Sequence, residues 1–190
     1  MLISICIPTY NRPSNLINCL NSLSLQTEKK FEVCISDNCS DENIEDIILE
    51  YSKNLNIKFK KNSENFGLGR NIIESVAMAS GKFVWILGND DLILPNAFNI
   101  LKDLIDKNSD VDFFYINSFH LKSEILEKFD FPFDTRKFDF RKLKKFSNYN
   151  KSGKLKFFEL INPFKSFEFM LSTYLCIFRR KLWLENTNVI

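Results

Sequence analysis

The sequence predicts an α/β fold with a mostly parallel central sheet flanked by helices. Short apolar runs alternate with amphipathic segments over residues 1–120, which is the pattern of parallel sheets covered by helices. The 190 residues are 45% hydrophobic and 26% charged, an ordinary globular composition that favours one domain with a sizeable core. Polar clusters follow three of the apolar runs, and parallel sheets bind ligands at the carboxyl ends of their strands.

The predicted strands are short runs rich in apolar and β-branched residues. They comprise residues 2–7, 31–35, 57–61, 83–87 and 111–119, and a further run at 174–178 follows a long stretch without clear periodicity. Within that stretch, residues 157–173 are expected to hold one or two short helices.

The predicted helices begin beside capping residues and carry apolar side chains at helical spacing. They are a helix capped by Ser14, a helix capped by Ser40 and Asp41, residues 70–78 with Ala77 among the inward-facing side chains, residues 96–106, and a helix starting in 179–186. Residues 62–69 are expected to form a loop before the third of these helices.

The cysteine and histidine content excludes several kinds of chemistry. Five scattered cysteines and a single histidine, His120, have no zinc-binding spacing and predict free thiols in a reducing cytoplasm. Catalysis by Ser–His–Asp or Cys–His is excluded, so acid–base work must fall to carboxylates. The longest candidate membrane segment, residues 167–178, is only about twelve residues long and contains polar side chains. The N-terminus lacks the basic region of a signal peptide and predicts a strand.

Positive charge is concentrated in residues 136–156, which contain nine Lys or Arg residues and one acid, Asp139. This segment carries +8, and because the whole chain carries +2, the remaining residues carry −6. Three interpretations remain open. The first is a solvated loop. The second is a surface that contacts anionic membrane or a lipid-linked acceptor. The third is a nucleic-acid-binding site, and nucleic-acid binding is not expected. The second interpretation, which comes after the solvated loop, rests on aromatic residues interleaved with the lysines: Phe138, Phe140, Phe146 and Tyr149.

Three polar clusters, Pro8–Arg12, Asp37–Asp41 and Asn89–Asp91, each follow a predicted strand. Together they predict a ligand site at one edge of the sheet. The adjacent carboxylates of Asp90 and Asp91 repel each other unless a cation or hydrogen-bond donors compensate. A divalent metal carrying a phosphorylated ligand would do so, and an acidic turn followed by a helix cap is the structural alternative.

Other nucleotide-binding motifs are missing. An acid at the end of the second strand, here Asp37 beside Asn38, can accept hydrogen bonds from a base or a ribose. However, the first loop is not Gly-x-Gly-x-x-Gly, and Gly67-Leu-Gly69 lacks the third glycine, which argues against an NAD site. No Gly-Lys-Ser/Thr loop occurs, which argues against an ATPase or GTPase.

Four segments follow one another in a familiar order and spacing: Ile7-Pro-Thr-Tyr-Asn-Arg12, Ile35-Ser-Asp-Asn-Cys-Ser-Asp41, Asn65-Phe-Gly-Leu-Gly-Arg-Asn71 and Leu87-Gly-Asn-Asp-Asp91. This set resembles the nucleotide-diphospho-sugar-binding half of family-2 glycosyltransferases, which have the GT-A fold. The resemblance covers residues 1–120. It implies that residues 121–190 are an incomplete acceptor-side region within a single domain, with a weaker match at Cys176–Arg180.

The resemblance implies a set of donor-binding residues: Pro8, Thr9, Tyr10, Arg12, Asp37, Asn38, Gly67, Arg70, Asn89, Asp90 and Asp91. The first three would line the base pocket, and Asp37 with Asn38 would read the base or the ribose. Asp90 and Asp91 would bind Mg²⁺ or Mn²⁺ as a DxD-like motif. Structural alternatives stay open, since Tyr10 can pack, Asn38 and Asp41 can cap a turn and a helix, and Arg70 can pair with Glu74.

The resemblance further implies an inverting, metal-dependent transfer from a nucleotide-diphospho-sugar to a hydroxyl of a glycan or lipid-linked acceptor. The setting would be bacterial surface polysaccharide synthesis, in the cytoplasm and peripherally at the inner face of the membrane. Two departures bear on activity. Gly88 stands where the family often has an acid, and no Glu-Asp pair follows Arg179-Arg180, so the general base is not found in this chain. We therefore expect an N-terminal portion or a truncated product, and the alternative function is a donor-binding module or relic that lacks the base.

Overall fold

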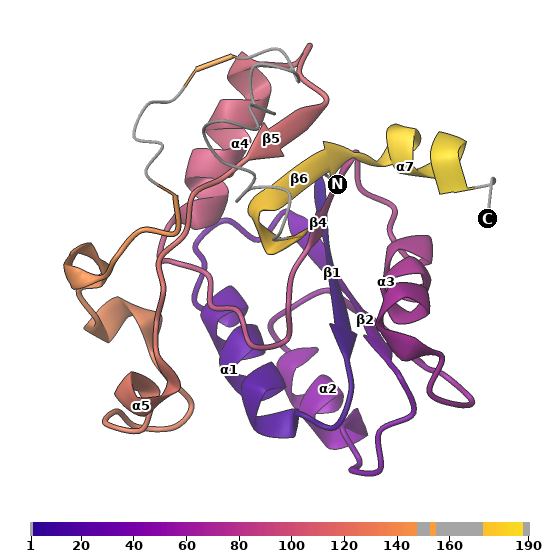
Figure 1. Ribbon diagram of the computed structural model, residues 1–190, viewed down its shortest axis with the longest axis vertical. Helices are drawn as coiled ribbons and strands as arrows, with labels where there is room; N and C mark the ends of the chain where they lie inside the picture. The colour runs from indigo at the N-terminus through magenta and orange to yellow at the C-terminus, as the bar shows by residue number, and fades with distance from the viewer. Residues whose placement is uncertain (1, 148–152, 155–172, 188–190) are drawn as a thin grey trace.

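The computed structural model describes residues 2–147, 153–154 and 173–187. It contains a six-stranded sheet in the order β3-β2-β1-β4-β6-β5 (Figure 1). The strands are β1 (Ile3–Thr9), β2 (Phe31–Asp37), β3 (Ile57–Lys61), β4 (Phe83–Ile86), β5 (Phe113–Tyr115) and β6 (Cys176–Arg179). β1 pairs in parallel with β2 and β4, and β2 pairs in parallel with β3. β6 is antiparallel to both of its neighbours. Three of the five strand pairings are therefore parallel, which confirms a mostly parallel sheet.

Helices cover both faces of the sheet (Figure 1). The α-helices of the described residues are α1 (Pro13–Ser24), α2 (Glu45–Tyr51), α3 (Gly67–Ala77), α4 (Ala97–Lys107), the short α5 (Ser123–Leu126), which lies away from the sheet, and α7 (Arg180–Thr187). Because side chains alternate along a strand, Ile3, Ile5 and Ile7 of β1 pack with α1, α2 and α4, whereas Cys6 packs with α3. The expected helices at 157–173 lie outside the described residues, apart from a 3₁₀ turn at Thr173–Leu175.

Several predicted helix boundaries were wrong. α1 begins at Pro13 rather than after Ser14, because proline suits the first helical position, and Arg12 precedes it without a side-chain cap. α2 begins at Glu45, since Ser40 and Asp41 bind other loop residues instead of capping a helix.

The third helix and the fifth strand also differ from the prediction. α3 begins at Gly67, three residues before the expected start, and Gly67 adopts a φ of 80° there. Ala77 at the end of α3 is exposed rather than buried. The strand expected at 111–119 is reduced to Phe113–Tyr115, because its partner β6 is itself only four residues long.

The described residues after position 120 are joined to residues 2–120 by side-chain packing and by strand pairing. β6 comes from residues 121–190 and yet lies between β4 and β5 in the sheet. Phe133 is buried at 2% exposure, and its backbone N–H donates to Asn18 Oδ1 of α1 at 2.8 Å. Asn21 Nδ2 of α1 donates to the Phe133 carbonyl at 2.9 Å. All five cysteines lie in the described part of the chain and none forms a disulfide there.

A buried carboxylate joins neighbouring strands at the amino edge of the sheet. Glu32 of β2 is fully buried and accepts hydrogen bonds from Ser4 Oγ of β1 at 2.6 Å and from the Ser80 N–H at 2.6 Å. Lys58 of β3 places its ammonium 2.9 Å from the same carboxylate. Burial by itself raises the pKa of Glu32, but these donors outweigh it and lower the pKa to about 2. The carboxylate is therefore a structural anchor at the edge opposite the predicted site.

Candidate functional site

The three predicted polar clusters meet at the carboxyl edge of the sheet, because β1, β2 and β4 are adjacent and parallel. Asn89 Nδ2, after β4, donates to the hydroxyl of Thr9 at 2.8 Å. Arg12, after β1, places Nη1 3.2 Å from Asp90 Oδ2. The Asp37–Asp41 loop is connected to the same β1 loop through Asn11. Side chains as distant in sequence as Thr9 and Asn89 therefore form one site.

The Asp90 and Asp91 carboxylates have different environments. Asp90 is half-exposed and pairs with the equally exposed Arg12. Asp91 Oδ2 accepts a hydrogen bond from the Gly88 N–H at 2.8 Å. Burial raises the pKa of Asp91 to about 6, the Gly88 hydrogen bond opposes this, and the charge of Asp90 adds to it. Asp90 is thus the carboxylate of the pair that faces solvent.

Gly88 explains how both carboxylates fold back over the end of β4. A Cβ at this position would lie 2.8 Å from both Asp90 Oδ1 and Asp91 Oδ2, closer than real Cβ atoms approach. In the structural alternative, the turn is followed by a helix cap: α4 starts at Ala97, and its N-cap residue Asn96 makes no side-chain capping hydrogen bond. The acidic turn itself is present.

The residues expected at the base side are more buried than their predicted role suggests. Asp37 is fully buried, and its carboxylate accepts hydrogen bonds from the backbone N–H of Ser40 at 3.2 and 3.3 Å and from the Ser40 hydroxyl. Lys61 Nζ lies 4.0 Å from the same carboxylate. Thr9 is also buried, whereas Tyr10 is 42% exposed at the same edge.

A network of side-chain amides lies at this edge, and three of its members were not among the predicted donor-binding residues: Asn62, Asn65 and Asn71. Asn38 Nδ2 donates to Asn65 Oδ1 at 2.6 Å, and Asn38 Oδ1 accepts from Asn62 Nδ2 at 3.3 Å. Asn62 Nδ2 also donates to Asn71 Oδ1 at 3.1 Å, and Asn71 Nδ2 donates to the Thr9 carbonyl at 3.2 Å. Asn62 follows β3 just as the predicted residues follow β1, β2 and β4, which was the available signal.

Arg70 and Gly67 lie in the first turn of α3, at the same edge. Arg70 Nε donates to Glu74 Oε1 at 2.7 Å, which is the helix pair expected as the structural alternative. Lys60 of β3 shares that carboxylate at 2.6 Å. The Arg70 side chain nevertheless remains 60% exposed, so its guanidinium stays accessible to an anion.

The carboxylates suit a cation that brings its own oxygen ligands better than a cation held by protein alone. Within the residues that the structure describes, no three His, Cys, Asp or Glu side chains gather at metal-binding distance. Of these two carboxylates, Asp90 is half-exposed, while Asp91 is held by the Gly88 N–H. Mg²⁺ and Mn²⁺ are commonly bound by one or two carboxylates together with phosphate oxygens, and this arrangement fits that pattern.

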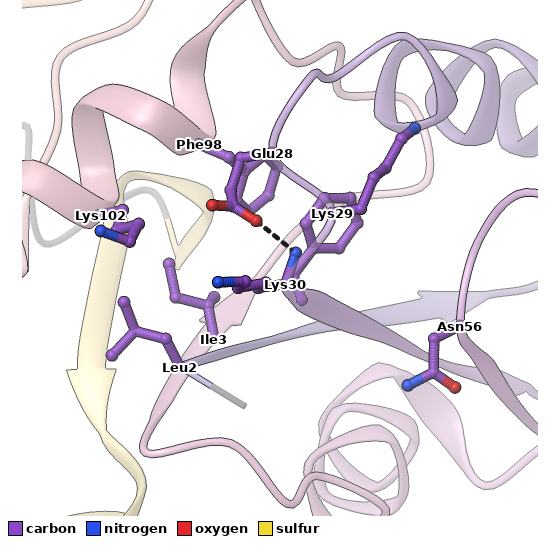
Figure 2. Close-up of a pocket in the computed structure, with 9 residues that line it drawn as sticks. Leu2, Ile3, Glu28, Lys29, Lys30, Asn56, Phe98 and Lys102 are labelled. Atoms are coloured by element: carbon purple, nitrogen blue, oxygen red, sulfur yellow. Dashed lines mark hydrogen bonds between the residues drawn. The ribbon is translucent and has the colours of Figure 1, made fainter.

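A separate cavity of about 350 Å³ opens at the amino edge of the sheet, opposite the site (Figure 2). Leu2, Ile3 and Phe98 contribute to its apolar lining. Two of its lysines are engaged elsewhere, since Lys29 Nζ bonds a backbone carbonyl and Lys102 Nζ lies 3.0 Å from Asp106. Because its lining residues lie at the amino edge, the cavity is not part of the carboxyl-edge site. The described residues include no helix whose length and hydropathy would let it span a bilayer.

The basic segment is described only up to residue 147 and again at 153–154. Arg136 and Arg141 pair with Asp134 and Asp139 at 2.8 Å each. Phe138 packs edge-on against Phe140 and Phe129. The expected contribution of Tyr149 lies outside the described residues.

Comparisons with known proteins agree with this architecture. The abequosyltransferase RfbV of Salmonella typhimurium is 41% identical over 115 residues, 58% of this chain and 34% of that protein. MJ1057 of Methanocaldococcus jannaschii, an uncharacterized glycosyltransferase, is 31% identical over 150 residues, 76% of this chain and 50% of that protein. The crystal structure of Staphylococcus aureus TarS 1–349 matches with a TM-score of 0.69 at 23% identity, over 98% of this chain and 49% of that chain.

A second TarS structure, in complex with UDP-GlcNAc, matches 61% of this chain and 34% of that chain at 30% identity, with a TM-score of 0.58. The chain spans about a third to a half of the length of the curated relatives it matches. The TarS matches confirm the GT-A-like α/β fold. A family model described as "Glycosyl transferase family 2" matches residues 4–182, and the chain therefore belongs to glycosyl transferase family 2.

Proposed function

We propose that this chain binds the nucleotide-diphospho-sugar donor of an inverting glycosyltransferase that acts in surface polysaccharide synthesis. The observation that carries the proposal is the meeting of the β1, β2 and β4 loops at one edge, with the exposed pair Arg12 and Asp90 at its centre. Two relatives support the substrate class. RfbV is named an abequosyltransferase, and TarS is named a poly(ribitol-phosphate) β-N-acetylglucosaminyltransferase with structures in complex with UDP and UDP-GlcNAc.

The two ends of the site have complementary tasks in this proposal. Tyr10 offers an exposed aromatic side chain to the base, and Asp37 with Asn38 keeps the neighbouring β2 loop in place. At the other end, Arg12 is within reach of a phosphate once it leaves Asp90. Asp90 would hold Mg²⁺ or Mn²⁺ together with the donor diphosphate, where the cation offsets the charge of the departing nucleotide.

The acceptor hydroxyl, of a glycan or a lipid-linked acceptor, needs a general base, and we assign that role to no residue of this chain. A module that binds the donor without transferring the sugar is the second candidate function. Incubating the chain with the donor it binds and measuring released sugar or glycosylated acceptor distinguishes the two. Detectable transfer or donor hydrolysis excludes the binding-only module.

Calorimetry with UDP, dTDP, CDP and GDP, with and without Mn²⁺, tests the donor site. We expect one nucleotide to bind and Mn²⁺ to strengthen its binding. Asp90→Asn should weaken the Mn²⁺-dependent binding by about tenfold or more, because it removes the exposed carboxylate. Asp103→Asn, an exposed acid on α4, is the matched control and should change nothing. The assignment is wrong if no nucleotide binds, or if Asp90→Asn leaves the Mn²⁺ effect intact.

Peripheral contact with anionic membrane is a further part of the proposal and rests on the basic segment. Arg136, Arg141, Lys137 and Lys154 pair with aspartates, so the attraction would come from the net positive charge of the segment as a whole. Co-sedimentation with vesicles containing anionic lipid, compared with neutral vesicles, measures it directly. Equal binding to both vesicle types would exclude an electrostatic membrane contact.

A further inference from the structure

One residue, Asn11, joins the loops that follow β1 and β2. Its Nδ2 donates to Asp41 Oδ2 at 2.9 Å, and its Oδ1 accepts from the Asp41 N–H at 2.9 Å. Its own backbone N–H donates to Ser40 Oγ at 2.9 Å. Asn11 and Asp41 thus form a reciprocal pair of hydrogen bonds across two loops that are 30 residues apart in sequence.

The connection continues into the core. The Ser40 hydroxyl, which accepts from Asn11, donates to the fully buried carboxylate of Asp37 at the end of β2. Asp37 is itself the last residue of β2, and its carboxylate also accepts from the Ser40 N–H. The exposed pair is therefore anchored to the sheet through Ser40.

Both loops adopt an uncommon backbone conformation beside this pair. Asn11 has a φ of 48° and Cys39 has a φ of 65°, in the left-handed region that non-glycine residues rarely occupy. Asparagine tolerates this region better than most residues, whereas cysteine has no such preference. Such conformations persist only when the surrounding contacts hold them, and the contacts between Asn11, Ser40 and Asp41 are placed to do so.

Asn11 lies between Tyr10 and Arg12, the two exposed side chains that the β1 loop contributes to the site. We propose that Asn11 and Asp41 form a clasp that positions Tyr10 and Arg12 to bind the nucleotide diphosphate of the donor. This role rests on the proposed function. Neither member of the clasp needs to contact the donor, so both are positioning residues, and Asp41 serves the β1 loop instead of capping α2.

Three variants isolate the clasp from backbone strain and from overall charge. Asn11→Asp keeps a residue that tolerates the left-handed region but sets two carboxylates against each other. Asp41→Asn preserves an acceptor for Asn11 Nδ2 and leaves the backbone donor of residue 41 unchanged. In the double variant, the new amide of residue 41 donates to the new carboxylate of residue 11, which restores the pair with its groups exchanged.

Two measurements are made on all four proteins. The first is the Kd for the nucleotide that the wild-type chain binds, and the second is amide hydrogen exchange of residues 10–12 and 39–41 without ligand. We expect Asn11→Asp to weaken binding by about tenfold and to speed exchange in both loops, with melting temperatures within about 2 °C of each other. Asp41→Asn and the double variant should stay within about threefold of the wild-type Kd.

The clasp is overturned if Asn11→Asp binds nucleotide as the wild type does, or if the double variant fails to recover binding. Equal exchange of both loops in all four proteins overturns it regardless of nucleotide binding. A wild-type chain that binds no nucleotide overturns the proposed function and the role of the clasp in donor binding. In that case, the exchange rates still decide whether the clasp holds the two loops together.

Discussion

Replacing Glu32 by glutamine is expected to destabilise the protein strongly, even though the residue lies at the edge opposite the candidate site. Glu32 is fully buried and holds Ser4 of β1, Ser80 before β4 and Lys58 of β3 around one carboxylate. Glutamine has nearly the same shape, so the change removes the charge with little change in volume. It also turns an amide N–H₂ toward groups that are themselves donors.

The magnitude follows from the pKa. The folded state lowers the pKa of Glu32 from 4.5 to about 2, and each unit corresponds to about 1.4 kcal/mol, which gives roughly 3–4 kcal/mol. Lys58 is 41% exposed, so solvent screens part of its attraction, and about 2–3 kcal/mol is the expected loss at pH 7. For a chain of 190 residues this corresponds to a fall in Tm of about 4–12 °C.

The pH dependence has a definite sign. Because the folded pKa lies below the unfolded one, the contribution of Glu32 is fully present above about pH 4.5. It is lost as the pH falls from 4.5 toward 2, where the carboxylate becomes protonated in the folded state as well. The free energies of unfolding of the wild type and of Glu32→Gln should therefore converge over this range.

Urea denaturation at pH 7, 4 and 3 measures both effects. Glu50→Gln, on the exposed surface of α2, is the matched control and should unfold as the wild type does at each pH. A wild-type midpoint for Glu32→Gln at pH 7 would refute the anchoring role of the carboxylate. A loss of stability that stays constant from pH 7 to pH 3 would show that the charge is not its cause.

Two further predictions concern packing. Gly81→Ala should lower the free energy of unfolding by about 1–3 kcal/mol, because the new Cβ would lie 2.7 Å from Ser4 Oγ and 2.8 Å from the Ser4 backbone nitrogen. Gly153→Ala is the control, because a Cβ there would have nothing within 4 Å. Equal stability of the two variants would contradict the clash. Phe133→Ala should lower the free energy of unfolding by about 3–5 kcal/mol, because the side chain is buried. Phe131 is 60% exposed, so Phe131→Ala is the control and should change the free energy of unfolding by less than about 1 kcal/mol. Similar losses in both variants would show that Phe133 does not anchor its segment to α1.

Local patterns in the sequence accounted for much of the fold. Strands β1, β2 and β4 were predictable because their side chains are almost all buried, so they appear as short, nearly continuous apolar runs. The position of β6 was not predictable, since pairing between β4 and β6 joins residues 92 to 96 positions apart. The start of α2 was predicted wrongly because its expected capping residue, Ser40, binds Asp37 instead.

The candidate site divides in the same way. The sequence placed Asp90 directly after a buried strand, and the structure leaves its carboxylate exposed beside Arg12, while its role in binding stays a prediction. The burial of Asp37 and the pairing of Asn11 with Asp41 were not identifiable, because they depend on which loops become neighbours. An asparagine in a turn has the same local signal whether it closes its own turn or holds another loop.

The sequence by itself determined the alternation of strands and helices, the edge of the sheet that carries the polar residues, and the membership of a family that this order of motifs indicates. These features depend on residues close together in the chain. Only the tertiary structure decided that Asp90 faces solvent while Asp37 and Asp91 turn inward, and that one asparagine clasps two loops. Burial and hydrogen-bond partners at the carboxyl edge are set by strands that the chain brings together from far apart, so no local pattern contains them.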